Sequence, residues 1–438
     1  MATGLGLVEL SLLLLMFMIA ILASGVWISI GLALVGLLAM VLTTNVPIGT
    51  VLATTVWSAS ASWTLAALPL FIWMGEILFR TKLSEEMFRG LSPWLQWLPG
   101  RLLHVNVVGC GIFAAVSGSS AATCATIGKI ALPELEQRGY DKGMALGSLA
   151  GSGTLGLLIP PSIPMVVYAV TANVSVLQVF LAGFIPGAMV MALYSGYIIV
   201  WSLLNPEKTP DRDPPLSFGA KMRQSQKLIP ILLLITGVFL SLILGIATAT
   251  ECAAWGVVGA LVLAWWSGTL TRATFLESVM SATRLTCMIM LILAGAAFTT
   301  AAMAYTGIPA ALAAWVEAKG LSPVMLIAAL TVMYIILGCL IDGISMIVLT
   351  AVIVLPMVQK AGFDLVWFGV YLVILVEMAQ ITPPVGFNLF VLQNMSGKDT
   401  FTVAKAAFPF FVLLNVAVVL ITMFPRIVLF LPKLVFPD

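Results

Sequence analysis

Two pairs of consecutive prolines lie in apolar sequence, next to residues with small or polar side chains. Pro160-Pro161 follows GSGTLGLLI, and Pro383-Pro384 follows EMAQIT. Proline lacks an N–H and clashes with the preceding helical turn, so each pair predicts a break in a helix. A broken helix leaves main-chain carbonyl oxygens unpaired, and such oxygens are ligands for hard cations such as Na⁺. The half-helix that follows presents N–H groups, which suit an anion.

Small polar residues surround the first break. The segment 111–128 contains Ser117, Ser119 and Ser120 in an apolar setting, and Thr154 precedes the first proline pair. Such clusters are also the usual packing residues between membrane helices, and the cluster alone favours packing. Because it lies beside a proline pair that occurs twice, we interpret it as part of a binding site.

Carboxylates and polar groups also surround the second break, at Asp342, Glu377, Thr382 and Asn388. An ionised carboxylate at the centre of a bilayer costs about 2.5–3.5 kcal/mol on insertion scales, so it usually faces a cavity or a partner. Alternatively, Asp342 and Glu377 lie near the interface or hold a helix end by hydrogen bonds. The sequence leaves both interpretations open for each residue.

The composition identifies the class of protein. The chain has 438 residues, of which 61% are hydrophobic and 9% are charged, and its mean hydropathy is +1.14. Soluble domains carry about 25% charged residues, so this is an integral membrane protein. A helical span takes about 20 apolar residues, which leaves room for roughly ten or more spans. The net charge of +2 predicts no nucleic-acid partner.

An enzymatic function is not expected. The single histidine is His104, and the five cysteines are scattered without a CxxC spacing, so no transition-metal site is predicted. An intramembrane enzyme would need a clustered His/Asp/Glu or Ser/Lys constellation, which the sequence lacks. The phosphate-binding pattern GxxxxGK[ST] is also absent. Energy for transport must therefore come from an ion gradient or from a partner subunit.

Hydropathy predicts the elements that position these residues. We expect re-entrant hairpins followed by broken helices in 103–172 and 342–396, and interfacial segments at 45–64 and 308–319. Glu76 lies four residues before Arg80, which predicts an ion pair at a helix end. The expected spans are 8–24, 26–43, 66–80, 178–203, 228–247, 252–268, 285–304, 321–340 and 406–431. The long apolar N-terminus has no Lys or Arg at its start, so we read it as two spans and not as a signal peptide.

A basic linker at 205–227 separates an N-terminal half (1–204) from a C-terminal half (228–438). It contains five of the 20 basic residues, which predicts a cytoplasmic location. The halves share a repeat, because LPELEQRGYD (132–141) resembles LPMVQKAGFD (355–364). Corresponding residues of the two segments are 223 positions apart, and so are the corresponding prolines of the two pairs. Internal repeats are typical of secondary transporters with a site near the membrane midplane.

The strings PLFIWMGEILFR, AAVSGSSAATCATIG, LPELEQRGYDKG, GTLGLLIPPSIP, GIATATECAAWG, GCLIDG and ITPPVGFNLFVLQ are spread from about residue 67 to 396. In this order they resemble the large membrane (DctM-like) subunit of tripartite ATP-independent periplasmic (TRAP) transporters. The resemblance implies an all-α polytopic membrane protein of two inverted repeats, each with a re-entrant hairpin and a broken helix. It also implies Na⁺-driven uptake of an organic acid, such as a C4-dicarboxylate or a sialic acid, by an elevator motion in the bacterial cytoplasmic membrane.

The resemblance further implies two protein partners, a small membrane subunit and a periplasmic substrate-binding protein. No additional four-span stretch precedes the first motif, so we expect the small subunit to be a separate chain. The alternative is a self-sufficient cation-coupled carboxylate symporter of related fold, which would need neither partner.

Two or more Na⁺ ions, bound mainly by main-chain oxygens, are implied by the same resemblance. The matching positions of the first site are Ala114, Ser117, Gly156, Ile159 and Pro160, and those of the second are Gly338, Ala379, Thr382 and Val385. Two residues depart from the family pattern: Ala114 replaces a frequent serine, and Ala379 replaces a common glycine. Because alanine restricts the main chain more than glycine does, the second site is the less secure of the two.

Position beside the breaks suggests further functional residues. Our hypothesis for the substrate-facing polar groups is Ser119, Ser120, Thr154 and Asn388. The other candidates are the two carboxylates and the remaining prolines of the pairs, namely Asp342, Glu377, Pro161, Pro383 and Pro384.

Overall fold

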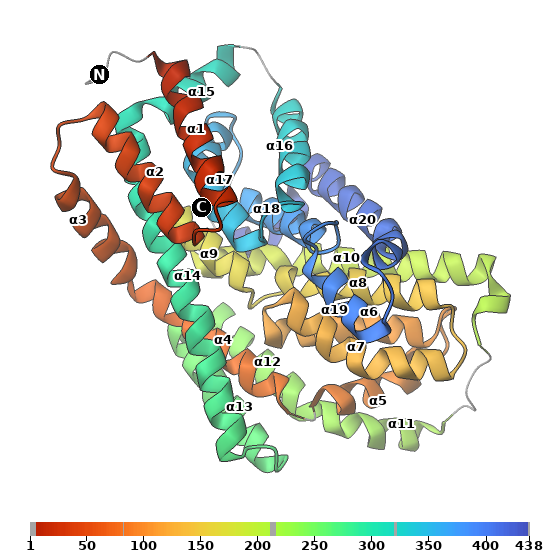
Figure 1. Ribbon diagram of the computed structural model, residues 1–438. Coiled ribbons are helices and arrows are strands. Elements are labelled where there is room, and N and C mark those ends of the chain that lie inside the picture. The colour runs from red at the N-terminus through yellow and green to blue at the C-terminus, as the bar shows by residue number, and fades with distance from the viewer. Residues whose placement is uncertain (1–5, 82, 211–215, 319–321, 437–438) are drawn as a thin grey trace.

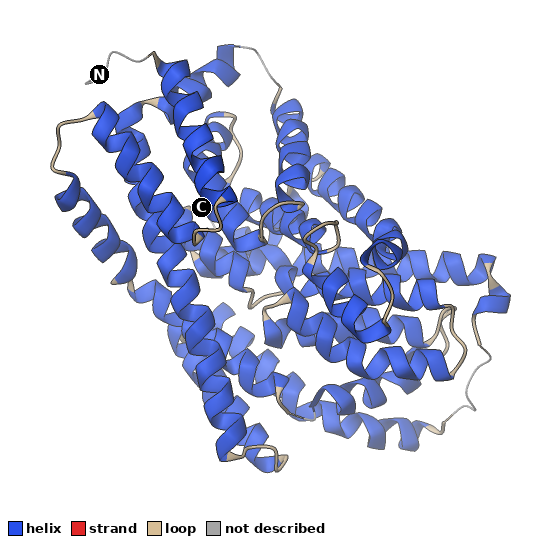
Figure 2. Cartoon of the chain, in the orientation of Figure 1, coloured by secondary structure: helices blue, strands red, loops and turns tan. Residues whose placement is uncertain are grey.

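A computed structural model of the chain describes residues 6–81, 83–210, 216–318 and 322–436. The described residues form helices and loops without a strand (Figure 2). The α-helices are α1 (Leu7–Ala23), α2 (Ile28–Thr43), α3 (Ile48–Ser60), α4 (Ala67–Phe79), α5 (Leu83–Leu95), α6 (Leu102–Ser117), α7 (Ser120–Gln137), α8 (Lys142–Leu158), α9 (Ile163–Thr171), α10 (Val176–Leu204), α11 (Phe218–Ser225), α12 (Ile229–Ile243), α13 (Ala249–Trp266), α14 (Arg272–Thr306), α15 (Ile308–Ala318), α16 (Pro323–Gly338), α17 (Gly343–Lys360), α18 (Leu365–Gln380), α19 (Phe387–Ser396), α20 (Thr400–Met423) and α21 (Arg426–Val435). The prediction of an all-α protein is confirmed.

Five of the described helices are long and apolar enough to cross a membrane by length and composition: α10, α13, α14, α17 and α20. Two bent helix pairs raise the number to seven when each pair counts as one span, and α8 with α9 is one of them, with a bend of 41°. Six shorter apolar helices add to these. The chain is therefore a multi-pass membrane protein, although fewer of its helices reach full span length than the roughly ten predicted.

The helix boundaries agree with most of the predicted spans, and two spans differ. The span predicted at 406–431 is wrong, because α20 ends at Met423 and α21 begins at Arg426. Pro425 separates these helices, as expected for a residue that cannot continue the preceding helical hydrogen bonds. The span predicted at 285–304 is part of a longer helix, α14, which has 35 residues. Segments 45–64 and 308–319 contain α3 and α15, whose interfacial location stays a prediction.

The repeat of 223 positions extends from the motifs to whole helices. Shifting the bounds of α7 by 223 gives 343–360, which are the bounds of α17. The same shift places α6 on α16, α8 on α18, α9 on α19 and α10 on α20, within a few residues at each end. Asp141 and Asp364, which the shift relates, both cap the next helix by accepting main-chain N–H groups. The two halves therefore share one order of elements.

Contacts between the halves are reciprocal. Helix α7 packs on α19 while α17 packs on α9, and α8 packs on α20 while α18 packs on α10. The same exchange occurs among the scaffold helices, a name used here for α2, α3, α4, α13 and α14. Helix α2 packs on α14, and α13 packs on α4. Helices α8 and α18, which correspond to each other, also pack together. This exchange is the pattern that a two-fold relation between equivalent halves produces.

The linker between the halves begins after α10 and contains α11. Residues 211–215, including Arg212, lie outside the described residues. Helix α11 packs on α5, where the Trp94 indole Nε1 donates to the Ser225 hydroxyl at 2.6 Å. The Lys221 Nζ lies 5.8 Å from the centroid of the same indole ring. The cytoplasmic location of the linker stays a prediction.

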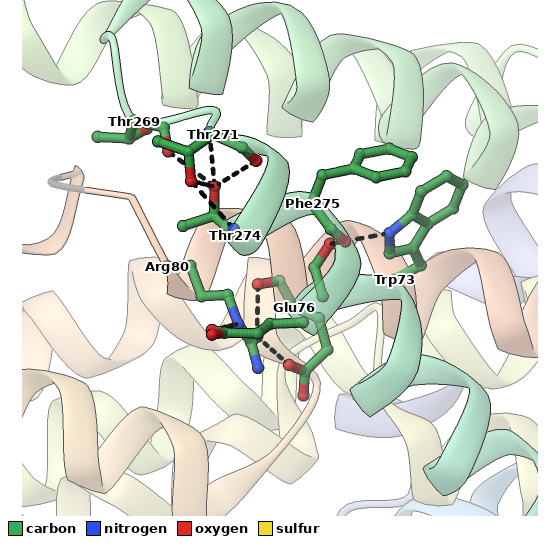
Figure 3. A network of polar contacts seen from close by, with 9 residues as sticks. Trp73, Glu76, Arg80, Thr269, Thr271, Thr274 and Phe275 are labelled. Atoms are coloured by element: carbon green, nitrogen blue, oxygen red, sulfur yellow. Dashed lines mark hydrogen bonds and ion pairs between the residues drawn. The ribbon is translucent and has the colours of Figure 1, made fainter.

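Polar contacts also join α4 to the corner between α13 and α14 (Figure 3). The predicted pair of Glu76 and Arg80 is confirmed, and Arg80 Nε also lies 3.8 Å from the Glu277 carboxylate. The Trp73 indole Nε1 donates to the Ser278 hydroxyl at 3.2 Å. Because Glu277 and Ser278 belong to α14, these contacts tie the scaffold helices of one half to those of the other. Figure 1 shows α1–α3 and α14 along one side of the molecule, and α6–α8 with α19 along another.

Candidate functional site

The first break begins where α8 ends at Leu158. Ile159 leaves the helix with ψ 121°, and α9 resumes at Ile163. The carbonyl of Gly156 cannot receive the usual helical hydrogen bond, because the residue four positions later is Pro160. The Leu157 carbonyl likewise has a proline, Pro161, four positions later. It accepts a hydrogen bond from the Ser162 hydroxyl instead. The Pro160-Pro161 pair therefore frees main-chain oxygens at the end of α8, as predicted.

A hairpin formed by α6 and α7 covers this break. Its turn is Gly118, whose φ of +58° suits glycine, followed by Ser119 as the N-cap of α7. The Gly118 carbonyl accepts a hydrogen bond from the Ile163 N–H at 3.4 Å, across the break. A Cβ atom at Gly156 would lie 2.5 Å from the Ser119 carbonyl oxygen. The hairpin turn is thus in close contact with the end of α8.

Hydroxyl groups hold the hairpin turn in shape. The Ser117 and Thr123 hydroxyls are 2.6 Å apart, and Thr123 Oγ1 donates to the Ser119 carbonyl at 2.8 Å. The structure thus places the predicted ligands Ser117 and Gly156 around one turn, with Ala114 one helical turn earlier on α6. The Ala114 carbonyl accepts the Gly118 N–H at 3.1 Å, and a carbonyl has a second lone pair. The assignment of these residues as Na⁺ ligands stays a prediction.

The second break lies between α18 and α19. Here the carbonyl of Ala379 has Pro383 four positions later, so it too lacks the usual helical donor. The Thr382 hydroxyl lies 3.1 Å from the Met378 carbonyl and 3.3 Å from the Ala379 carbonyl. The Gly386 N–H donates to the Thr382 carbonyl at 3.0 Å, within the same loop. Both proline pairs have a cis peptide bond.

Helices α16 and α17 form the hairpin next to the second break. A Cβ atom at Gly338, the last residue of α16, would lie 2.6 Å from the Ala379 Cβ. The alanine at position 379 therefore fits because position 338 has no side chain. The predicted ligands Gly338 and Ala379 are in contact, while Thr382 and Val385 are half-buried in the loop.

Asp342 is the N-cap of α17 and takes the place that Ser119 has at α7. Its Oδ2 accepts the N–H groups of Ile344 and Ser345, each at 3.1 Å, and its Oδ1 accepts the Ser345 hydroxyl. These bonds occupy both carboxylate oxygens. In this structure Asp342 therefore holds the hairpin turn, in line with the structural interpretation of this residue.

The residues predicted to face the substrate lie in the same region, but their polar atoms bind the protein. The buried Ser120 hydroxyl donates to the Asn388 Oδ1 at 2.8 Å, and the Asn388 Nδ2 donates to the Ala150 carbonyl at 3.1 Å. The Thr154 hydroxyl donates to the Gly151 carbonyl at 2.8 Å. Ser119 Oγ accepts the Ala122 N–H at 3.4 Å. The bonds of Ser120 and Asn388 join the first hairpin and α8 to α19, while Ser119 bonds within the hairpin and Thr154 within α8. Substrate contact by these four residues stays a prediction.

Glu377 differs from the other candidates. It is fully buried in α18, and neither of its carboxylate oxygens has a hydrogen-bond partner. Tyr194 of α10 is its electrostatic neighbour, and the Tyr194 hydroxyl lies 3.5 Å from that of Thr154. Sequence reasoning did not single out Tyr194. The available signal was a hydroxyl within an apolar span of a chain that has only seven tyrosines.

Comparison with known proteins identifies the family. Residues 15–427 match the family described as tripartite ATP-independent periplasmic transporter, DctM component. The chain is 31% identical over 383 residues to the C4-dicarboxylate TRAP transporter large permease protein DctM of Pseudomonas aeruginosa, covering 87% of this chain and 89% of that protein. It is also 31% identical over 432 residues to the corresponding protein of Rhodobacter capsulatus, covering 95% and 97%.

More distant matches extend the comparison. The sialic acid TRAP transporter large permease protein SiaM of Vibrio cholerae is 27% identical over 384 residues, covering 85% of this chain and 87% of that protein. Among solved structures, the YdaH transporter of Alcanivorax borkumensis aligns with a TM-score of 0.64 at 12% identity, covering 92% of this chain and 98% of that one. This structural likeness shows a shared transporter fold. The family match and the two 31% identities show that the chain belongs to the DctM family of TRAP transporters, as a large permease subunit and not an enzyme.

Proposed function

We propose that this permease imports an organic acid in symport with Na⁺, together with a periplasmic binding protein and a small membrane subunit. The observation that carries the proposal is the pair of broken helices. At both breaks a proline removes the helical donor of a buried carbonyl, at the equivalent positions Gly156 and Ala379. Carbonyl oxygens at unwound helix ends coordinate Na⁺ in secondary transporters.

The substrate class follows from charge and from the relatives. The half-helices α9 and α19 begin beside the breaks, and their N-terminal N–H groups favour an anion. The names of the relatives specify C4-dicarboxylate, sialic acid and isethionate, all of which are anions at neutral pH. We therefore propose a carboxylate such as a C4-dicarboxylate or a sialic acid as the substrate.

The proposed movement is an elevator motion of the hairpins and broken helices against the scaffold helices. Its support is the division of contacts, because α2, α3, α4, α13 and α14 pack on one another while α6, α7, α8, α19 and α20 form a second group. Two halves that repeat in inverted orientation in the bacterial cytoplasmic membrane would give the two end states of such a motion. The linker is proposed to lie in the cytoplasm because of its five basic residues.

The proposal is tested by reconstituting the chain with the small subunit and the binding protein in liposomes. Uptake of a labelled C4-dicarboxylate or sialic acid is measured with external Na⁺ and again with K⁺ in its place. We expect uptake with Na⁺ and a loss of at least about tenfold with K⁺, because K⁺ is too large for a site shaped for Na⁺. Undiminished uptake with K⁺ would contradict the sodium mechanism. Uptake by this chain without either partner would instead favour the self-sufficient symporter.

A further inference from the structure

Helices α5 and α11 form a joined pair along the lower edge of the view in Figure 1. The Ser225 hydroxyl accepts the Trp94 indole N–H at 2.6 Å and donates to the Gly90 carbonyl at 3.0 Å. A Cβ atom at Gly90 would lie 2.9 Å from Leu228 Cγ, so the main chain of α5 lies directly against the end of the linker. The rings of Trp94 and Phe218 meet edge to face, with their centroids 6.0 Å apart. We call this pair of helices the α5–α11 platform.

The platform leaves large apolar side chains uncovered. Phe218 on α11 is 68% exposed, and Trp97, two residues after α5, is 67% exposed. Trp94 and Met222 are exposed as well. Phe218 and Met222 are four residues apart and therefore lie on the same face of α11. Neighbouring exposed apolar side chains of this size indicate a surface that another molecule covers.

Basic side chains accompany these apolar residues. Residues 216–228 contain Lys221, Arg223 and Lys227 and no acidic residue. The Lys221 Nζ lies 5.8 Å from the centroid of the Trp94 indole, and Arg223 is exposed. Within the part of the chain that the structure describes, neither Lys221 nor Arg223 forms an ion pair with a carboxylate. The platform therefore combines aromatic surface with positive charge that the protein does not balance.

The connections of the platform place it at the ends of membrane helices. The linker follows α10, a candidate span, and α11 leads into α12 with a bend of 61°. Helix α11 thus turns away from the direction of the apolar helix that follows it. A short amphipathic helix in this position, with aromatic and basic side chains, is typical of the interface between membrane and water. The second half differs, because the repeat of 223 positions relates α5 to α15, which contains no lysine or arginine.

We propose that the α5–α11 platform binds anionic phospholipids of the bilayer, with Lys221 and Arg223 on the headgroup phosphates and Phe218 and Met222 at the boundary with the acyl chains. Charge complementarity selects this occupant, because an anionic lipid balances the basic groups while its chains cover the apolar ones. The inference goes beyond the proposed function and holds whether or not Na⁺ drives uptake. Helix α5 also packs on α6 and α7, so the lipid would contact the helix that supports the first hairpin.

The test titrates the full chain, purified with the small membrane subunit in detergent, with phosphatidylglycerol or with phosphatidylcholine. Native mass spectrometry counts the lipids bound. We expect Lys221→Gln/Arg223→Gln to weaken phosphatidylglycerol binding by about tenfold, because each basic residue near an anionic headgroup contributes to the attraction. Binding of phosphatidylcholine should stay unchanged. Equal phosphatidylglycerol affinity in the variant and the unaltered protein would overturn the inference.

The matched control is Arg138→Gln/Lys142→Gln, which removes the same charge from two side chains that carboxylates already balance. Arg138 lies 2.7 Å from the Glu134 carboxylate, and Lys142 lies 3.8 Å from that of Glu136. This variant should change phosphatidylglycerol affinity by less than about twofold. An equal loss in the control would show that net charge alone attracts the lipid, and the platform would then be no specific site.

A second measurement protects the test against a folding defect in the double variant. In a background without the five native cysteines, Met222→Cys receives a spin label, and the protein is reconstituted in vesicles that contain phosphatidylglycerol. We expect the label to collide more often with oxygen, which concentrates in the bilayer, than with a water-soluble nickel complex. More frequent collision with the nickel complex would contradict the inference. So would loss of the small subunit from Lys221→Gln/Arg223→Gln at unchanged lipid affinity, because a protein would then be the partner of this face.

Discussion

The two broken helices share their order of elements but differ in how far the rest of the protein covers them. At the first break, Pro160 and Pro161 are both buried, and the Gly118 carbonyl of the hairpin turn accepts the Ile163 N–H. At the second break, Pro383 is half-buried and Pro384 is exposed. The Gly386 N–H, equivalent to that of Ile163, donates within its own loop.

The side chains account for this difference. The first break has glycine in the broken helix, at Gly156, so the hairpin can approach its main chain. The second has alanine at the equivalent position, Ala379, and the glycine is in the hairpin, at Gly338. Repeated helices therefore do not require repeated packing. If both breaks bind Na⁺ as proposed, their different coverage predicts different affinities at the two sites.

The largest effect is expected from Gly156→Ala. The added methyl group would lie 2.5 Å from the Ser119 carbonyl oxygen and 2.6 Å from Thr123 Oγ1, so the hairpin turn must move away from α8. Overpacking of this kind costs about 1–3 kcal/mol, which predicts a loss of Na⁺-driven uptake of about tenfold or more. Uptake in liposomes, normalised to the amount of folded protein, measures this loss.

Two further alanine variants complete this comparison. Gly196→Ala is the control, because a Cβ atom at Gly196 on α10 meets no atom within 4 Å, and uptake should be unchanged. Gly338→Ala places its methyl 2.6 Å from the buried Ala379 Cβ, beside the second break, whose Pro384 is exposed. It should reduce uptake less than Gly156→Ala does. Equal losses at both positions would show that the two breaks are equally rigid.

The second prediction concerns the accessibility of the two breaks. Ser162 and Val385 are equivalent under the repeat, but Ser162 is 1% exposed while Val385 is half-buried. In a background without the five native cysteines, Val385→Cys should react with a maleimide about tenfold faster than Ser162→Cys, because thiol reactivity follows exposure. Mass spectrometry of timed samples gives both rates. Equal rates would contradict the difference in coverage seen in the structure.

Much of this arrangement could be predicted from the sequence because it depends on local chemistry. A proline pair breaks a helix wherever it occurs, and the repeat of 223 positions showed that the breaks correspond. An aspartate before a helix, such as Asp342, is a common cap, and this interpretation was among the alternatives. The pair of Glu76 and Arg80 followed from helical spacing alone.

Contacts between distant segments could not be predicted in this way. The Ser120 hydroxyl reaches Asn388 across 268 positions, and no local pattern indicates such a pairing. Substrate contact was the more obvious interpretation of two polar residues beside breaks. The neighbourhood of Glu377 likewise depends on Tyr194, which lies in a span whose sequence indicates only a membrane helix. The break between α20 and α21 was missed although Pro425 and the charged Arg426 interrupt the apolar sequence there.

The smallest effect is expected at the hydrogen bond between Ser120 and Asn388, which joins the first hairpin to the second half. The equivalent positions, Gly343 and Met165, cannot form this bond. It therefore stabilises the hairpin over the first break and has no counterpart at the second. A buried neutral hydrogen bond contributes about 1 kcal/mol, so Ser120→Ala should lower Na⁺ affinity at the first site by about two- to fivefold. Asn388→Ala should do so to a similar extent and also remove the side-chain donor to the Ala150 carbonyl.

A double-mutant cycle separates this bond from other effects of the two residues. If the bond carries the effect, the loss in Ser120→Ala/Asn388→Ala should be smaller than the two single losses combined, with a coupling energy of about 0.5–1.5 kcal/mol. Additive losses would instead support the prediction that each residue contacts the substrate separately, and the KM for the substrate would then rise in both single variants. The cycle therefore decides whether these two residues hold the first hairpin closed or line the substrate site.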